Sequence, residues 1–237
     1  MKLFILSTAI TLLFAINTFA QLEGNPENLC RNGFFPRESR EFKLASVKGA
    51  KNERVYFYGD DSRACPNDKN CQTKSYVIPN DEVIVSRTFG KWACSWYQPK
   101  KGSETVGWIA VDKLDFKETN SNPAINDWLG KWNYAGNSIE IGKSKTADLL
   151  TITGSAFWKG LGDNVHVGEL DDESKPAGNE LKIGENETGE YECKVTMRLL
   201  GKYLIVADNL QCGGVNVTFS GVYQKKKELA TENTEIF

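Results

Sequence analysis

Short runs of alternating hydrophobic and polar residues make up most of the chain, and Gly, Asn, Asp and Pro separate these runs. Successive side chains of a β-strand point to opposite faces, so a period of two predicts half-buried strands. Apolar residues at the helical period are almost absent after residue 20. The pattern therefore predicts an all-β protein built from short antiparallel strands.

The predicted strands form two groups. The first group contains residues 54–58, 76–78, 82–86, 91–97 and 106–110. The second group has eight or nine candidate strands within residues 128–224, namely 131–134, 138–141, 149–153, 156–158, 165–170, 180–183, 191–197, 203–207 and 215–223. So many short strands joined by short turns predict an eight- to nine-stranded antiparallel barrel or sandwich after a smaller first barrel.

A polar segment that ends in proline, residues 117–123, separates the two groups and is the predicted linker. It divides the mature chain into an N-terminal segment (21–48), a first barrel (49–116), a second barrel (124–226) and a flexible tail (227–237). Because the linker has no apolar face, we expect the fragments 21–119 and 122–237 to fold separately.

Residues 1–20 have the pattern of a cleaved secretory signal peptide. Lys2 precedes an apolar run over residues 3–16, and Thr18-Phe19-Ala20 gives the small-x-Ala cleavage pattern. A transmembrane anchor is the alternative, but it needs about 20 apolar residues. The mature protein is therefore predicted to be periplasmic or secreted and not membrane-spanning.

Six cysteines follow the signal, and an even number in an exported protein predicts disulfides. Cys193 and Cys212 are far from the others along the chain and are expected to pair with each other. Cys65 and Cys71 bracket a turn-rich loop, which leaves Cys30 for Cys94; the pairing among these four stays open. A zinc site would need closely spaced Cys or several His, and a thiol nucleophile would need a His base.

The composition of the chain limits the classes of function that it can have. The chain is 40% hydrophobic and 25% charged, as in ordinary globular proteins, and its net charge of −2 disfavours nucleic-acid binding. His166 is the only histidine. Alternation places it on the face of its strand opposite Val165 and Val167, without a recognisable nucleophile motif. We expect no metal, no cofactor and no enzymatic activity.

The acidic run of residues 171–173 is the other candidate for chemistry. Two carboxylates on either side of a sugar cleft would support glycoside hydrolysis, and a regular oxygen-ligand pattern would support a calcium loop. The run lies before Lys175 and Pro176 and lacks that ligand pattern. We therefore interpret it as a solvated loop.

Residues 52–114 resemble the bacterial SH3-like domains of secreted and cell-wall proteins. The resemblance rests on the short strand 55–58, the turn Pro79-Asn80-Asp81 before residues 82–86, Gly90 and Trp92 opening the next strand, and Gly107-Trp108-Ile109 near the end. Asn80-Asp81 stands where Gly-Asp is commoner, and the loop between Cys65 and Cys71 is an insertion. The resemblance implies a five-stranded barrel that binds cell-wall peptides or a protein partner without catalysis.

The second domain has weaker resemblances. Gly130-Lys131-Trp132 resembles the first-strand motif of lipocalin-type barrels, and residues 203–223 resemble the C-terminal region of uncharacterised secreted bacterial proteins. Its size and predicted disulfide also resemble periplasmic lysozyme-inhibitor barrels. The alternative function is therefore a secreted inhibitor of a lysozyme-like or other hydrolase that acts through the second barrel.

Aromatic residues of the first domain are the main candidates for binding. Tyr and Trp are more abundant there than a small core needs, and exposed rings supply rigid contact area for a peptide. We expect Trp92 and Trp108 in the core. The candidate ligand-binding residues are Tyr58, Tyr76 and Tyr97, and the expected partner is a cell-wall peptide or an envelope protein.

Overall fold

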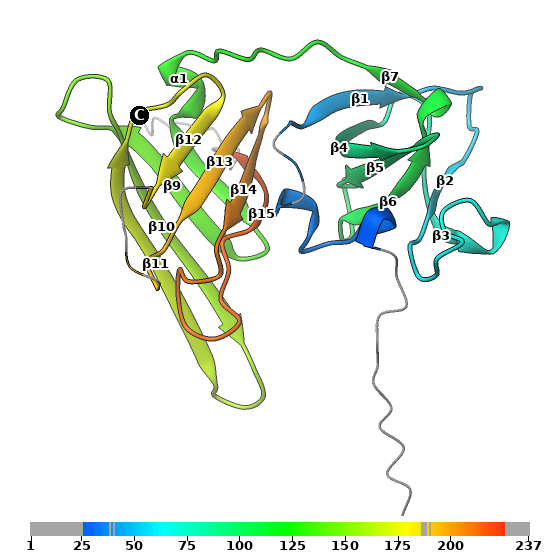
Figure 1. The fold of residues 1–237 in the computed structure, drawn as a ribbon. Helices are drawn as coiled ribbons and strands as arrows, with labels where there is room; N and C mark the ends of the chain where they lie inside the picture. Colours follow the sequence, from blue (N-terminus) through cyan, green and yellow to red (C-terminus); the bar gives the residue numbers. More distant parts are fainter. Residues whose placement is uncertain (1–25, 38, 40, 186–188, 190, 226–237) are drawn as a thin grey trace, which may run out of the picture.

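The computed structural model describes residues 26–37, 39, 41–185, 189 and 191–225, and these form two antiparallel β-sheets (Figure 1). The predicted all-β class is confirmed. The only α-helix of the described residues is the short α1 (Ile125–Trp128), and no helix among them is long and apolar enough to cross a membrane. The predicted signal peptide and tail lie outside the described residues.

The first sheet contains the first seven strands in the order β3-β2-β6-β5-β4-β1-β7. Their bounds are β1 Lys43–Val47, β2 Val55–Tyr58, β3 Gln72–Val77, β4 Glu82–Phe89, β5 Trp92–Tyr97, β6 Thr105–Ala110 and β7 Leu114–Phe116. Short 3-10 helices precede or interrupt it at η1 Pro26–Asn28, η2 Phe35–Arg37, η3 Lys69–Cys71 and η4 Val111–Lys113. Strand β3 has β2 as its one neighbour in the sheet and is therefore an edge.

Both faces of the first sheet carry apolar side chains. Phe57, Val85, Ala93 and Ile109 are buried together on the inner face, where the sheet curves around its own core. Alternation along β5 places Trp92, Cys94 and Trp96 on the outer face, and all three are also buried. A single small barrel cannot bury both faces alone, so other parts of the chain must cover the outer face.

The second sheet contains eight strands in the order β11-β10-β9-β8-β15-β14-β13-β12. Their bounds are β8 Gly130–Tyr134, β9 Asn137–Lys143, β10 Leu150–Lys159, β11 Val165–Ser174, β12 Glu180–Ile183, β13 Val195–Leu200, β14 Tyr203–Asp208 and β15 Gly221–Lys225. The two end strands approach each other where the Ser174 hydroxyl donates to the Lys182 carbonyl at 2.5 Å. The sheet is therefore a nearly closed barrel.

Large side chains fill the interior of the second barrel. Trp128, Trp132, Leu150, Met197 and Phe219 are fully buried within one apolar cluster. The indole N–H of Trp132 donates to the Trp128 carbonyl at 2.9 Å, which satisfies its polar group inside the core. The described interior is thus a packed core.

Several element predictions in the second barrel are wrong, and the predicted strand 191–197 begins only at Val195. Residues 149–153 and 156–158 belong to one strand, β10, and Gly154 between them packs closely on Phe219 instead of ending the strand. Residues 171–173 lie in β11 and not in a loop. The predicted strand 215–223 is mostly a loop, because the Asp208 carboxylate accepts the Phe219 N–H that a strand would use in its ladder.

All three disulfides that the spacing favours are present. They join Cys30 to Cys94, Cys65 to Cys71 and Cys193 to Cys212. The first ties the N-terminal segment to the outer face of β5, and the last anchors the loop before β15. Such bonds form in an oxidising extracellular or periplasmic compartment.

An apolar interface joins the two sheets. Phe35 and Phe42 of the N-terminal segment, Ile84 and Trp96 of the first sheet, and Ile205 of the second belong to one buried cluster. Trp96 packs edge-on against Tyr203 of β14, with ring centres 5.6 Å apart. The N-terminal segment lies between the sheets beside β14 and β15 (Figure 1).

Candidate functional site

The tryptophans of the first domain lie on its outer face, where the rest of the chain covers them. Trp92, Trp96 and Trp108 are at most 6% exposed. Their indole N–H groups donate to Asn67 Oδ1 at 2.9 Å, Glu104 Oε2 at 2.6 Å and the Asn28 carbonyl at 2.8 Å, respectively. These rings therefore stabilise the interface and leave no indole face for a partner.

Tyr97 lies on the opposite face of the sheet from the other candidate residues. It packs against the inner core, whereas Tyr58 packs against the outer cluster. Burial and the carboxylate of Asp81 raise the pKa of the Tyr97 phenol to about 12. The structure therefore does not bring Tyr97 into one groove with Tyr58 and Tyr76.

Tyr58 and Tyr76 do share a face, on the hairpin of β2 and β3. Tyr56 is paired with Tyr76 across the strands, and their ring centres lie 5.9 Å apart. Tyr58 follows two positions later and lies over Trp92 at 4.6 Å, with its hydroxyl 3.3 Å from Gln72 Oε1. Tyr76 is the most open of these rings, at 41% exposure.

Arg54 completes this surface, because its guanidinium carbon lies 4.6 Å from the centre of the Tyr76 ring. We call Arg54, Tyr56, Tyr58 and Tyr76 the aromatic strip. Tyr56 and Arg54 were missed as candidate binding residues, although alternation along residues 54–58 places positions 54, 56 and 58 on one face. The strip lies on the β2–β3 hairpin at the edge of the sheet, on the same outer face as the tryptophans, and Tyr58 packs against the outer cluster.

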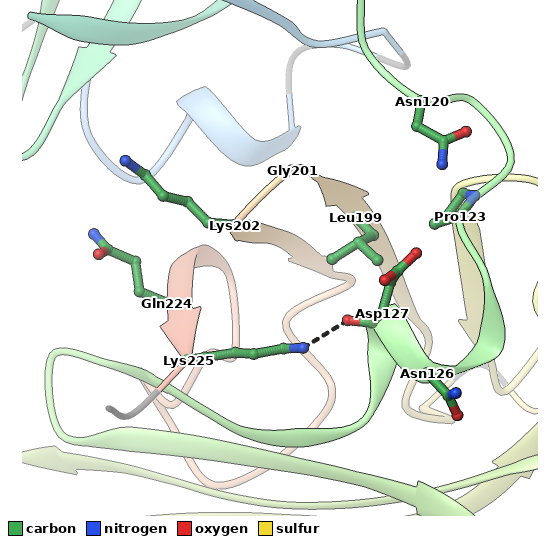
Figure 2. A pocket seen from close by; sticks show the side chains of 9 residues that line it. All are labelled: Asn120, Pro123, Asn126, Asp127, Leu199, Gly201, Lys202, Gln224 and Lys225. Atoms are coloured by element: carbon green, nitrogen blue, oxygen red, sulfur yellow. Dashed lines mark hydrogen bonds between the residues drawn. The ribbon is translucent and has the colours of Figure 1, made fainter. Parts of the chain in front are cut away.

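A crevice of about 660 Å³ lies beside the domain boundary, between α1, the turn after β13 and β15 (Figure 2). Its lining residues are Asn120, Pro123, Asn126, Asp127, Leu199, Gly201, Lys202, Gln224 and Lys225. Figure 2 shows the Lys225 ammonium donating to the Asp127 carbonyl, at 2.7 Å.

Each charged side chain that lines this crevice already has a partner within the protein. Lys202 pairs with Glu82 of the first sheet at 3.1 Å, and Lys225 also lies 4.9 Å from the Trp132 ring centre. The Asp127 carboxylate accepts the Ala124 N–H at 2.9 Å. Of these contacts, the Lys202–Glu82 pair crosses the domain boundary, and the contacts of Lys225 and Asp127 lie within the second domain and its first helix.

Two further polar contacts cross the same boundary. The Arg37 guanidinium pairs at 3.1 Å with Asp208, whose carboxylate is fully buried and also accepts the Thr218 hydroxyl at 2.8 Å. The Tyr134 hydroxyl donates to Glu104 at 2.7 Å. Burial and that carboxylate raise the pKa of Tyr134 well above its usual range.

His166 lies on β11, on the face opposite Val165 and Val167. Its ring packs 5.4 Å from the Trp158 ring, and Nδ1 lies 2.6 Å from the Val215 carbonyl. Glu169, three positions further along β11, lies on the other face of the strand. Within the described residues, no carboxylate or hydroxyl forms a hydrogen bond with the imidazole, so no nucleophile–base pair is assembled there.

Fold and site together define an all-β protein of two antiparallel sheets, stabilised by three disulfides and joined by an apolar interface. Its β2–β3 hairpin carries a group of partly exposed tyrosines, the aromatic strip. The chain matches no protein-family model, no curated protein and no solved structure.

Proposed function

We propose that this is a periplasmic or secreted, non-catalytic binding protein whose first domain binds a cell-wall peptide through the aromatic strip. The observation that carries the proposal is the grouping of Tyr56, Tyr58 and Tyr76 with Arg54 on one outer face of the β2–β3 hairpin. Rigid aromatic rings give contact area at a low cost in conformational entropy.

The position of the strip favours an extended peptide. Strand β3 is an edge of the sheet, so its outer backbone groups are open to pair with another chain. The strands β2-β6-β5-β4-β1 are successive neighbours in the sheet, and all of them except β1 lie within residues 52–114, the range of the resemblance to SH3-like barrels. Such barrels bind peptides on aromatic surfaces.

The positive charges around the aromatic strip also favour a peptide of the cell wall as the partner. Arg54 and Lys74 are exposed on this hairpin, and the Lys91 ammonium lies 5.6 Å from the centre of the Trp92 ring beneath Tyr58. Peptides of bacterial cell walls carry free carboxylates. A cationic rim around aromatic rings suits an acidic peptide.

The test is binding of the mature chain to purified soluble cell-wall peptides, measured by calorimetry. Tyr56→Ala combined with Tyr76→Ala removes the two rings whose loss disturbs the core least. Truncating a central aromatic residue typically costs about 2 kcal/mol or more, so we expect binding at least about 30-fold weaker.

Tyr191→Ala is the matched control, because Tyr191 is 75% exposed and lies in the second domain. His166→Ala should also leave binding unchanged. Thermal melts of all variants should show that the fold survives. Full binding by the double variant, or an equal loss in the Tyr191 variant, would contradict the proposal.

A further inference from the structure

The hairpin of β10 and β11 carries an exposed apolar surface at its free end. Phe157 and Val167 are paired across the two strands, and Val165 follows on the same face. Their side chains are 48%, 61% and 50% exposed, and Leu161 at the turn is 97% exposed. Figure 1 shows this hairpin extending past the other strands of the barrel. Exposed apolar side chains that adjoin each other indicate an interaction surface more than scattered ones do.

No neighbouring strand covers this part of β10. The pairing of β9 with β10 ends at Ser138 and Ser155, two residues before Phe157. Beyond that point the Phe157 N–H donates to the Asn137 side chain at 3.2 Å, which ends the ladder. This edge of β10 therefore has no strand partner among the described residues, and the exposed side chains of Phe157 and Val167 show that the outer face is open, while the other face packs Trp158 on His166.

Acidic residues continue the same outer face toward the middle of the sheet. Glu169 lies opposite Ser155, and Asp171 and Glu140 flank Thr153 from the two neighbouring strands. These side chains line a shallow hollow of about 390 Å³. Within the described residues their carboxylates form no ion pair or hydrogen bond, and Lys131, opposite Glu140, is the one cation lining the hollow.

The loop before β15 packs against the β10–β11 hairpin and holds it in place. The Gly214 N–H donates to the Val167 carbonyl at 3.1 Å, and the disulfide of Cys193 and Cys212 anchors the same loop. Gly168 permits this contact, because a Cβ there would lie 2.2 Å from the Cys212 carbonyl oxygen. A surface that is already rigid loses little conformational entropy when it binds.

We propose that this outer face, formed by Phe157, Val165, Val167, Glu169 and Asp171, docks a basic protein. The apolar end supplies the buried centre of the contact, and the unpaired carboxylates beside it select a cationic partner surface and speed its association. A second copy of the chain is disfavoured, because it would bring the same acidic residues together. The inference does not rest on the aromatic strip.

The test measures binding of a lysozyme with a high isoelectric point to the immobilised mature chain, by interferometry at 150 mM salt. We expect saturable one-to-one binding. Phe157→Ser combined with Val167→Thr should weaken it at least tenfold. Glu169→Gln combined with Asp171→Asn should lower the association rate at least fivefold at low salt, with a smaller effect at high salt, where charges are screened.

Matched controls carry the same changes elsewhere. Ile78→Ser removes a 42% exposed apolar side chain of the first domain, and Asp115→Asn with Glu118→Gln removes two exposed acids there. Both should bind as the parent does. Absence of saturable binding, an equal loss in the controls, or sedimentation showing that this face joins two copies would overturn the proposal. Loss of peptide binding in the aromatic-strip variant would not affect it.

Discussion

A substitution of Ile205 tests whether the two domains form one stable unit. Its neighbours Leu204 and Val206 point into the second barrel, whereas Ile205 points outward and belongs to the interface cluster. It is nevertheless 0% exposed, because the N-terminal segment and the first sheet cover it. In the fragment 122–237 that cover is absent, and the same side chain becomes a surface residue.

The expected effect of Ile205→Ala therefore depends on context. In the full chain it removes a fully buried side chain, which typically costs about 2–5 kcal/mol. With about 2–4 °C of melting temperature per kcal/mol at this size, a loss of about 3 kcal/mol lowers the melt by about 6–12 °C. In the fragment the change is a surface substitution, worth within about 0.5 kcal/mol.

Calorimetric melts of both forms provide the assay, with Leu204→Ala as the control. Leu204 is fully buried inside the barrel, so its truncation should destabilise the full chain and the fragment alike. We also expect the fragments 21–119 and 122–237 to melt cooperatively, each below the full chain. An equal effect of Ile205→Ala in both forms, or none in the full chain, would refute the interface argument.

Two further predictions concern the tyrosine and the disulfide. The pKa of Tyr97 is raised to about 12, so the neutral phenol stabilises the fold fully below pH 10 and this contribution is lost as the pH rises toward 12. Absorbance titration should show that the Tyr97→Phe variant lacks one phenol that titrates near pH 12 in the parent. A missing phenol with a midpoint near pH 10 would contradict this prediction. Replacing Cys193 and Cys212 with serine opens a loop of sequence separation 19 and should cost about 3 kcal/mol in a thermal melt. Free thiols in the native protein would show that this framework is wrong.

The alternation along the chain was enough to predict the all-β class and the two faces of individual strands. In β5 it separates Trp92 and Trp96 from Tyr97, as in the structure. Cysteine spacing likewise favoured the three pairs that are present. The strand faces and the pairs Cys65–Cys71 and Cys193–Cys212 are local features, because backbone geometry and short separations in sequence decide them, whereas Cys30 and Cys94 are 64 residues apart.

Local pattern also produced the errors in the second barrel. Consecutive acids at residues 171–173 suggested a loop, yet outward positions of a sheet tolerate charge, and β11 continues through them. The alternating residues 215–223 suggested a strand, yet the buried Asp208 carboxylate takes hydrogen bonds from Thr218, Phe219 and Ser220. Hydrogen bonds to a residue of another strand, β14, outweighed the local strand preference.

The sequence by itself indicated most of the strand-forming segments, the pairing of Cys193 with Cys212 and the excess of aromatic residues in the first domain. Only the tertiary structure decided which aromatic residues stay accessible. Phe35 and Ile205, far from β5 in sequence, bury Trp96 in one cluster, whereas Tyr58 of the β2–β3 hairpin packs against this cluster but is only partly buried, and Tyr76 stays 41% exposed. Covering one face of a sheet depends on long-range packing that strand periodicity does not encode, which is why Tyr76 stays accessible and the tryptophans do not.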